Sequence, residues 1–214
     1  MEKDLAYQRR SYEKSELREE NTTENPMILF EDWFEDVEEK DKNSENNAMT
    51  LSTIDENGFP QNRIVLLKKF TDKGFEFFTN YKSDKGKSIE KNPKVCLSFF
   101  WPAVERQVII RGKAEKLSAE ESDEYFQTRP RGSQIGAWVS HQSSIIENRG
   151  VLKNKQEELE KEFKDQTIKR PDFWGGYLIR PETIEFWQGR PNRLHDRFQY
   201  KKQGENWKII RLAP

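Results

Sequence analysis

Cysteine and histidine are scarce in this chain of 214 residues. The one cysteine, Cys96, excludes a disulfide within the chain, and its place in the apolar run VCLSFFW predicts a buried, unreactive thiol. One cysteine and two histidines that stand far apart give no metal-ligand spacing, so no metal site is expected. No Ser-His-Asp or Cys-His arrangement can be placed, which favours chemistry carried by an organic cofactor.

Long apolar runs and glycine-rich phosphate loops are missing as well. No segment approaches transmembrane length, and the amino terminus is charged from its second residue, unlike a secretory signal peptide. A cytoplasmic protein is therefore expected. Neither G-x-G-x-x-G nor G-x-x-x-x-G-K occurs, which excludes a Rossmann or P-loop nucleotide site. The balance of 37 basic and 38 acidic residues gives no general reason to expect binding to nucleic acid or membranes.

Apolar residues are few, at 33% against 35% charged residues, and the mean hydropathy is -1.04. Disordered chains share such a composition, but this chain also has 14 phenylalanines, six tryptophans and six tyrosines. These aromatics stand in short apolar runs between turn signals, as a folded β protein requires. A thin core that is completed by a partner subunit and a cofactor explains both observations.

Residues 1–25 are polar and charged, which predicts a separate amino-terminal segment, in the simplest interpretation a mobile tail, before a single domain over residues 26–214. Apolar residues at helical spacing predict a helix over 27–40. Ser118 and Glu121 form a capping box, which predicts a helix that ends near Thr128. Further helices are expected over 83–91 and 148–164, with a polar loop over 131–144. Seven or eight strands, mostly joined by hairpins, are expected elsewhere, which makes the fold class mainly β with α: an antiparallel β-barrel with peripheral helices.

Two short cationic segments are candidates for binding anionic ligands. Arg63 and Lys68 lie five residues apart in a predicted strand, so they should point to opposite faces and could each serve one ligand. Lys85 follows Ser83 at the start of a predicted helix, where free N–H groups attract phosphate. Pattern alone favours ordinary solvent-exposed surfaces for both segments.

A third candidate combines Tyr125, Arg129 and Ser133. Tyr125 and Arg129 share the i, i+4 spacing of one helix face, and Ser133 follows in the predicted loop. Two hydroxyls and a forked guanidinium suit a phosphate monoester. The alternative, a helix carboxyl terminus stabilised by an arginine, stays open.

The fourth candidate is the run RLHDR, in which alternation would place Arg193, His195 and Arg197 on one face of a strand. Three potentially cationic groups in a row are unfavourable unless an anionic or electron-rich ligand covers them. A histidine taken alone is more often structural, but the two flanking arginines favour a functional role. Trp187 could form a wall for a planar cofactor, although aromatics in strands more often belong to the core.

Several motifs occur together in one order: RIVLLK, ERQV, YFQTRPRGSQIGAWVSHQSS, FWGGY, IEFWQG, RLHDRF and the terminal WKIIRLAP. From about Arg9 to Pro214 the chain resembles the pyridoxine (pyridoxamine) 5'-phosphate oxidase family. The resemblance implies an FMN-binding split barrel that forms a homodimer, with FMN in clefts between the subunits. It also implies oxidation of pyridoxamine 5'-phosphate or pyridoxine 5'-phosphate to pyridoxal 5'-phosphate, with O2 as the electron acceptor and H2O2 as its product.

The resemblance also implies residue roles, position by position. The amino-terminal segment is implied to cover the bound substrate as a lid. Arg193, His195 and Arg197 are the implied catalytic residues, the first two over the substrate and the third near the flavin ring. The implied substrate contacts are Arg9, Tyr12, Lys68, Tyr125, Arg129, Ser133, Arg193 and His195. The implied FMN contacts are Arg63, Ile64, Val65, Leu66, Leu67, Lys68, Phe78, Thr79, Lys85, Gln107, Gln142, Ser143, Trp187 and Arg197.

Two positions depart from the family pattern. Asp84 stands where the family commonly has arginine, and Phe78 stands where it usually has tyrosine. An aspartate that pointed at the FMN phosphate would repel it by on the order of a few kcal/mol. We therefore expect Asp84 to turn to solvent or to cap the helix, with somewhat lower affinity for FMN.

Two other functions stay open. One is another split-barrel FMN oxidoreductase of the flavin reductase type, which would have no need for the substrate cradle or the RLHDR run. The other is a non-catalytic protein that binds flavin or pyridoxal phosphate, for which Asp84 is the only support.

Overall fold

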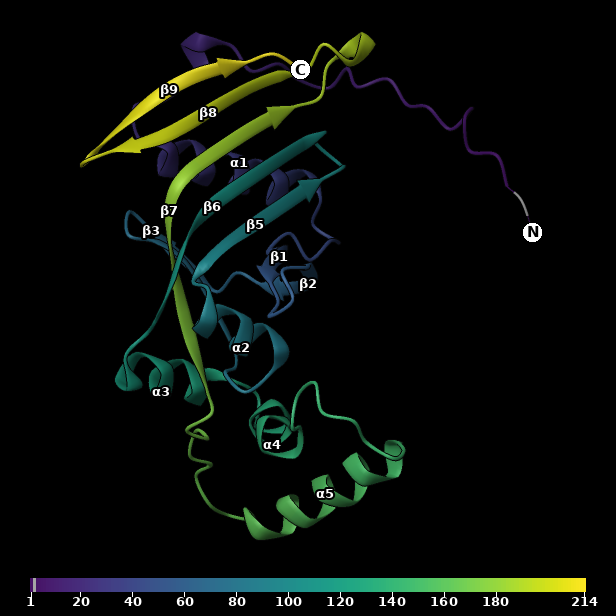
Figure 1. The fold of residues 1–214 in the computed structure, drawn as a ribbon, viewed down its shortest axis with the longest axis vertical. Helices are drawn as coiled ribbons and strands as arrows, with labels where there is room; N and C mark the ends of the chain where they lie inside the picture. The colour runs from purple at the N-terminus through teal and green to yellow at the C-terminus, as the bar shows by residue number, and fades with distance from the viewer. Residues whose placement is uncertain (2) are drawn as a thin grey trace. The chain divides into compact units, whose positions relative to one another are not determined.

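The computed structural model describes residue 1 and residues 3–214 (Figure 1). The chain forms two compact units. Unit 1 consists of Met1–Met49, Leu97–Arg111 and Pro181–Pro214, and unit 2 consists of Thr50–Cys96 and Gly112–Arg180. Four strands run through both units: β1 (Ala48–Ile54), β5 (Lys94–Trp101), β6 (Arg106–Lys116) and β7 (Trp174–Gln188).

The strands of the described residues form one nine-stranded sheet in the order β2-β1-β5-β6-β7-β4-β3, with β8 paired to β7 and β9 paired to β8. The long strand β7 pairs with β6. It also pairs in antiparallel fashion with β4 along its first half and with β8 along its second half. The sequence predicted seven or eight strands. The three-residue strand β3 is too short to be recognised from a sequence pattern. The other strands are β2 (Pro60–Leu66), β3 (Lys69–Thr71), β4 (Gly74–Asn80), β8 (Asp196–Gln203) and β9 (Asn206–Leu212).

The core of unit 1 contains the helix α1 (Pro26–Lys40), which confirms the predicted helix over 27–40. Asn25 caps it by accepting a hydrogen bond from the main-chain N–H of Met27, and Pro26 suits the first turn because it has no N–H to satisfy. The buried face of α1 carries aromatic rings. Phe30 packs on Phe99 with 5.4 Å between ring centroids, and Trp33 packs on Phe186 at 5.2 Å. Each buried aromatic contributes about 1.5–3 kcal/mol.

Unit 2 contains four helices among its described residues: α2 (Asp84–Lys91), α3 (Ala119–Thr128), α4 (Arg131–Val139) and α5 (Arg149–Glu162). The capping box of Ser118 and Glu121 is present, and α3 ends at Thr128 as predicted. The prediction of a polar loop over 131–144 was wrong, because α4 occupies its first nine residues. Tertiary packing explains the difference, since Ile135 and Ala137 are buried in one cluster with Leu159 of α5.

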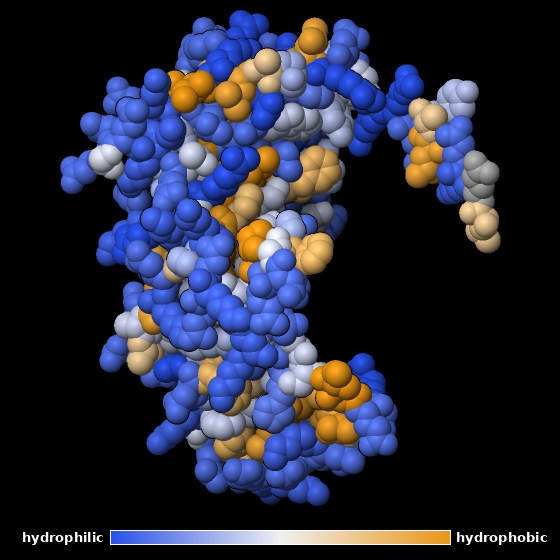
Figure 2. Space-filling view, in the orientation of Figure 1, coloured by the Kyte–Doolittle hydropathy of each residue, from blue (hydrophilic) through white to orange (hydrophobic). Residues whose placement is uncertain are grey.

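The surface reflects the polar composition of the chain. The face seen in Figure 2 is mostly hydrophilic, with a group of apolar side chains over the segment between α4 and α5. Ile145, Ile146 and Val151 are exposed in and beside this segment. No helix of the described residues is long and apolar enough to cross a membrane.

Candidate functional site

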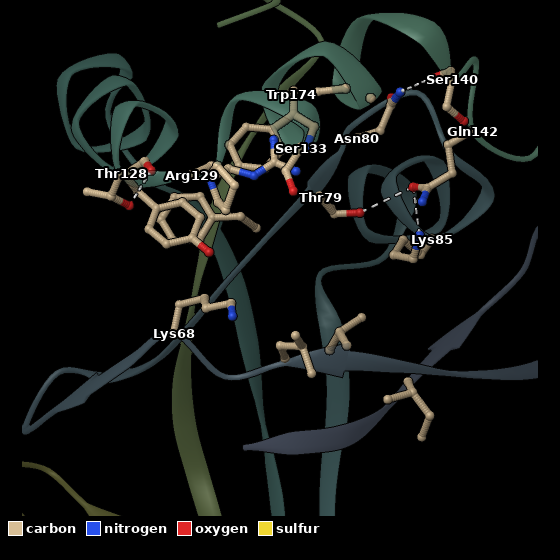
Figure 3. A pocket seen from close by; sticks show the side chains of 18 residues that line it. Lys68, Thr79, Asn80, Lys85, Thr128, Arg129, Ser133, Ser140, Gln142 and Trp174 are labelled. Carbon is tan, nitrogen blue, oxygen red and sulfur yellow. Dashed lines mark hydrogen bonds between the residues drawn. The ribbon is translucent and has the colours of Figure 1, made fainter. Parts of the chain in front are cut away.

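A pocket of about 600 Å³ lies within unit 2 (Figure 3). Its volume is in the range of sites for small molecules and cofactors. Residues from β2, β4, β7, α2, α3 and α4 line it, together with the segments that follow β2, α3 and α4. Of the residues predicted for the site, the lining includes Ile64, Val65, Leu66, Lys68, Phe78, Thr79, Lys85, Tyr125, Arg129, Ser133 and Gln142.

One side of the pocket is cationic and carries hydroxyl groups. In Figure 3, Lys68 and Arg129 lie on this side. Tyr125 belongs to the same lining, and its ring stacks on Phe78 with 3.8 Å between centroids. Phe78 thus packs against the Tyr125 ring. Burial raises the pKa of the Tyr125 phenol, which keeps it protonated and able to donate a hydrogen bond.

The Arg129 side chain is held in place although not all of its N–H donors have an acceptor. Its guanidinium lies over the Trp174 ring at 4.5 Å from the centroid. The buried Nη1 atom has no hydrogen-bond partner among the described residues, and burial lowers the pKa of the group. A buried cationic donor that is left unpaired is costly, and an anion in the pocket would pair it.

The other side of the pocket centres on Lys85, at the start of α2. Its Nζ donates to Oε1 of Gln142 at 2.9 Å and to Oγ of Ser83 at 3.3 Å. The Thr79 hydroxyl donates to the same Gln142 oxygen at 3.4 Å (Figure 3). Burial, followed by the nearby charge of Arg63, lowers the pKa of Lys85 to about 8. The ammonium thus lies against neutral partners at a helix amino terminus, a setting that favours an anionic ligand.

Three residues predicted as FMN contacts in unit 2 do not line the pocket. Arg63 donates to main-chain oxygens of Leu51 and Gln61 and to the hydroxyl of Thr53. Leu67 is buried. The Ser143 hydroxyl accepts the main-chain N–H of Asp84 at 3.2 Å, which fixes the segment after α4 against the start of α2.

A second group of predicted residues lies together in unit 1. The rings of Trp187 and His195 have centroids 4.5 Å apart, and Tyr12 lies edge-on to Trp187 at 5.8 Å and 6.1 Å from His195. Burial and the charge of Arg193 lower the pKa of His195, so its imidazole is predominantly neutral at pH 7.

The remaining predicted residues of unit 1 have separate surroundings. Arg197 forms an ion pair with Glu185 at 2.7 Å and donates to the main-chain oxygen of Ala213. Gln107 donates to the Ser98 hydroxyl. Arg193 and Arg9 are both exposed.

Two geometric predictions were wrong. Arg193 and His195 do not share a strand face with Arg197, because β8 begins at Asp196 and Arg193 lies in the short 3-10 helix η2 (Pro191–Arg193). Likewise β2 ends at Leu66, so Lys68 lies beyond the strand. Turn residues with positive φ, Asn192 and Arg193, end the extended run before His195.

Other lining residues were missed by the sequence analysis. The segment of α4 and the residue after it was expected to be a loop, so the lining residues Gly136, Ala137 and Ser140 were not predicted. An apolar pattern at helical spacing, Ile135 with Trp138 and Val139, was the available signal. The other missed residues are Asn80, Thr128, Pro130 and Trp174.

Comparison with known proteins gives matches along most of the chain. The family model "Pyridoxamine 5'-phosphate oxidase" matches residues 37–162, and "Pyridoxine 5'-phosphate oxidase C-terminal dimerisation region" matches residues 174–214. The pyridoxine/pyridoxamine 5'-phosphate oxidase of Flavobacterium johnsoniae is 56% identical over 98% of this chain and 99% of its own. That of Christiangramia forsetii is 50% identical over the full length of both.

Solved structures have the same fold. PhzG from Burkholderia lata 383, in complex with tetrahydrophenazine-1-carboxylic acid, has a TM-score of 0.85 at 26% identity and covers 91% of this chain and 95% of its own. A pyridoxamine 5'-phosphate oxidase-related, FMN-binding protein from Nostoc punctiforme has a TM-score of 0.70 at 15% identity, with 86% of this chain and 97% of its own covered. These matches confirm the predicted fold class, a mainly β split barrel with helices. The match to the dimerisation region supports a homodimer.

Proposed function

This chain belongs to the pyridoxamine 5'-phosphate oxidase family, and we propose that it oxidises pyridoxamine 5'-phosphate and pyridoxine 5'-phosphate to pyridoxal 5'-phosphate. We propose FMN as its cofactor and O2 as its electron acceptor, which is reduced to H2O2. Relatives that are 50–56% identical along the whole chain support the oxidase class.

The observation that carries the proposal is the unpaired, buried Nη1 of Arg129 in a pocket that also holds Lys68, Tyr125 and Ser133. Two cations and two hydroxyls match the charge and the acceptor oxygens of a phosphate monoester. Binding energy gained at this phosphate is remote from the reacting carbon, so it can be used to orient that carbon. We assign the substrate phosphate to this side of the pocket.

The residues on the opposite side fit the phosphate of FMN. Lys85 is buried, it donates hydrogen bonds to the uncharged side chains of Ser83 and Gln142, and it lies at a helix amino terminus. The apolar side chains of Ile64, Val65 and Leu66 line the same pocket and suit a flat ring. We propose that this side holds FMN together with Arg63, Leu67, Thr79, Gln142 and Ser143, and that Lys68 and Phe78 contact FMN from the opposite side of the pocket. We propose that Gln107, Trp187 and Arg197 complete the site at the interface of a homodimer.

When bound, FMN would supply the two-electron chemistry by taking a hydride from C4' of the substrate. The protein would orient the substrate and stabilise charge. We assign Arg193 and His195 to the substrate, which both residues position and whose charge Arg193 balances, and Arg197 to the flavin ring, where a cation stabilises negative charge. We further propose that residues 1–25, with Arg9 and Tyr12, cover the bound substrate as a lid on the domain of residues 26–214.

The test is anaerobic mixing of the FMN-loaded protein with pyridoxamine 5'-phosphate while the visible absorbance of the flavin is followed. Bleaching that reverses in air, with pyridoxal 5'-phosphate formed, is the expected result. Flavin that stays oxidised with both phosphorylated vitamers would favour a flavin reductase or a binding protein instead. The double variant R193A/H195A should lose most turnover while it retains its FMN, and unchanged turnover would contradict the assignment of these two residues.

A further inference from the structure

His195 receives a hydrogen bond from the main chain of its own turn. The main-chain N–H of Arg190 donates to Nδ1 of the His195 imidazole at 3.1 Å. An amide N–H can only donate, so the ring nitrogen that faces it must present a lone pair. A neutral imidazole carries one proton, which must then lie on Nε2.

The turn is built to hold this geometry. Asn192 has φ 57° and Arg193 has φ 64°, two consecutive left-handed residues without a glycine. Each such residue costs about 1 kcal/mol or more, which persists only where the surrounding structure fixes it. The reversal brings residue 195 back to residue 190, and the main-chain N–H of Leu194 closes the turn on the Pro191 oxygen at 3.1 Å.

The donor is itself held by three contacts from the Arg190 side chain. Its guanidinium donates to the main-chain oxygen of Ser15 at 3.2 Å and pairs with Glu16 at 3.2 Å and with Asp196 at 3.4 Å. These contacts limit the motion of residue 190 and so of its N–H. Trp187 packs on the imidazole at 4.5 Å between centroids, which limits rotation of the ring.

We propose that the main-chain N–H of Arg190 holds neutral His195 in its Nε2–H form, so that His195 presents a hydrogen-bond donor, and not a proton acceptor, to an oxygen of the bound vitamer. The proposal rests on the proposed function for the identity of the ligand. It makes the main chain at residue 190 a positioning element, and it excludes neutral His195 as a general base through Nε2.

Nuclear magnetic resonance of the FMN-loaded, full-length protein with 15N-labelled histidine tests the tautomer without any activity. The chain has two histidines, and His141 is exposed, so the variant H141Q assigns the spectrum. Above the pKa of His195, a pyridine-type shift for Nδ1 and a pyrrole-type shift for Nε2 are expected. A protonated Nδ1, or an even mixture of both forms, would overturn the proposal whether or not the protein oxidises the vitamers.

A matched pair of variants tests the donor role. In H195Q the amide reaches about as far as Nε2 and can still donate, whereas the shorter H195N reaches only the position of Nδ1. The dissociation constant of pyridoxal 5'-phosphate from the FMN-loaded protein should rise about tenfold or more in H195N and by clearly less in H195Q. Equal losses in the two variants, with FMN content unchanged, would overturn the donor role. Failure of the proposed function would instead appear as an absence of vitamer binding in the parent protein.

Discussion

Lys85 and Gln142 meet in unit 2 although 57 positions separate them in the chain, with the lysine ammonium donating to the Gln142 amide oxygen at 2.9 Å. The contact joins the start of α2 to the segment after α4. Because Gln142 is neutral, this contact brings no negative charge to the lysine, which can still pair with an anion.

We predict that FMN binding weakens above pH 8. Burial, and then the charge of Arg63, lowers the pKa of Lys85 to about 8, so the amine is charged below that pH and neutral above it. A phosphate favours the ammonium form, so binding at high pH requires proton uptake, and affinity should fall by up to about tenfold per pH unit. Titration of FMN fluorescence from pH 7 to 9.5 measures this. K85M should bind FMN weakly with a flatter profile, and a flat profile in the parent protein would contradict the prediction.

Replacing Asp84 should strengthen FMN binding. Asp84 is exposed at the first position of α2. Burial lowers the pKa of both Arg63 and Lys85, and the negative charge of Asp84 partly opposes this. D84N removes a negative charge near these cations, which should improve FMN affinity by about 1 kcal/mol, or roughly fivefold. E90Q makes the same charge change near the other end of α2 and serves as the control. The gain should shrink at high salt, and an equal gain in E90Q would refute a local effect.

We predict that Arg129 contributes strongly to phosphate binding and little to the stability of the fold. R129M removes the cation beside Tyr125, and we expect the affinity for pyridoxal 5'-phosphate to fall by about 1.5–3 kcal/mol, on the order of 10–150-fold. The free energy of unfolding without ligands should change by less than about 1 kcal/mol, since the lost cation–π contact with Trp174 is offset by removal of an unpaired buried donor.

The control for R129M is R131M, two residues along the chain. Arg131 donates to main-chain oxygens of Phe163 and Gln166, away from this pocket. The R131M protein should bind pyridoxal 5'-phosphate as the parent does. A large loss of stability without loss of phosphate affinity in R129M would show that Arg129 is structural.

Glu105 should anchor the amino-terminal segment. Its buried carboxylate accepts the main-chain N–H groups of Glu13 at 2.8 Å and Lys14 at 3.0 Å. In E105A both N–H groups lose this acceptor. We expect the free energy of unfolding to fall by about 2–3 kcal/mol and tryptic cleavage after Lys14 to become faster. E105Q retains an acceptor oxygen and should be milder in both measurements. Equal cleavage rates in the parent and E105A would show that the segment is held by other contacts.

Local features were predictable from the sequence because their hydrogen bonds join residues close in the chain. The capping box of Ser118 and Glu121 is an example, as is the helix start at Ser83. The helix α4 was not predicted, because its polar and glycine-containing sequence is stabilised by contacts of Ile135 and Ala137 with Leu159 of α5 and with Ile168, which are distant in the sequence.

The sequence by itself determined the family, the fold class and the chemical types at the site, since motifs and charged groups are properties of the chain. It did not determine how those groups meet. Tertiary structure decided that Lys85 lies against Gln142, that a buried donor of Arg129 stays unpaired, and that His195 lies in a strained turn facing the N–H of Arg190. These relationships depend on packing and on a positive φ in non-glycine residues, which the surrounding fold imposes against local preference.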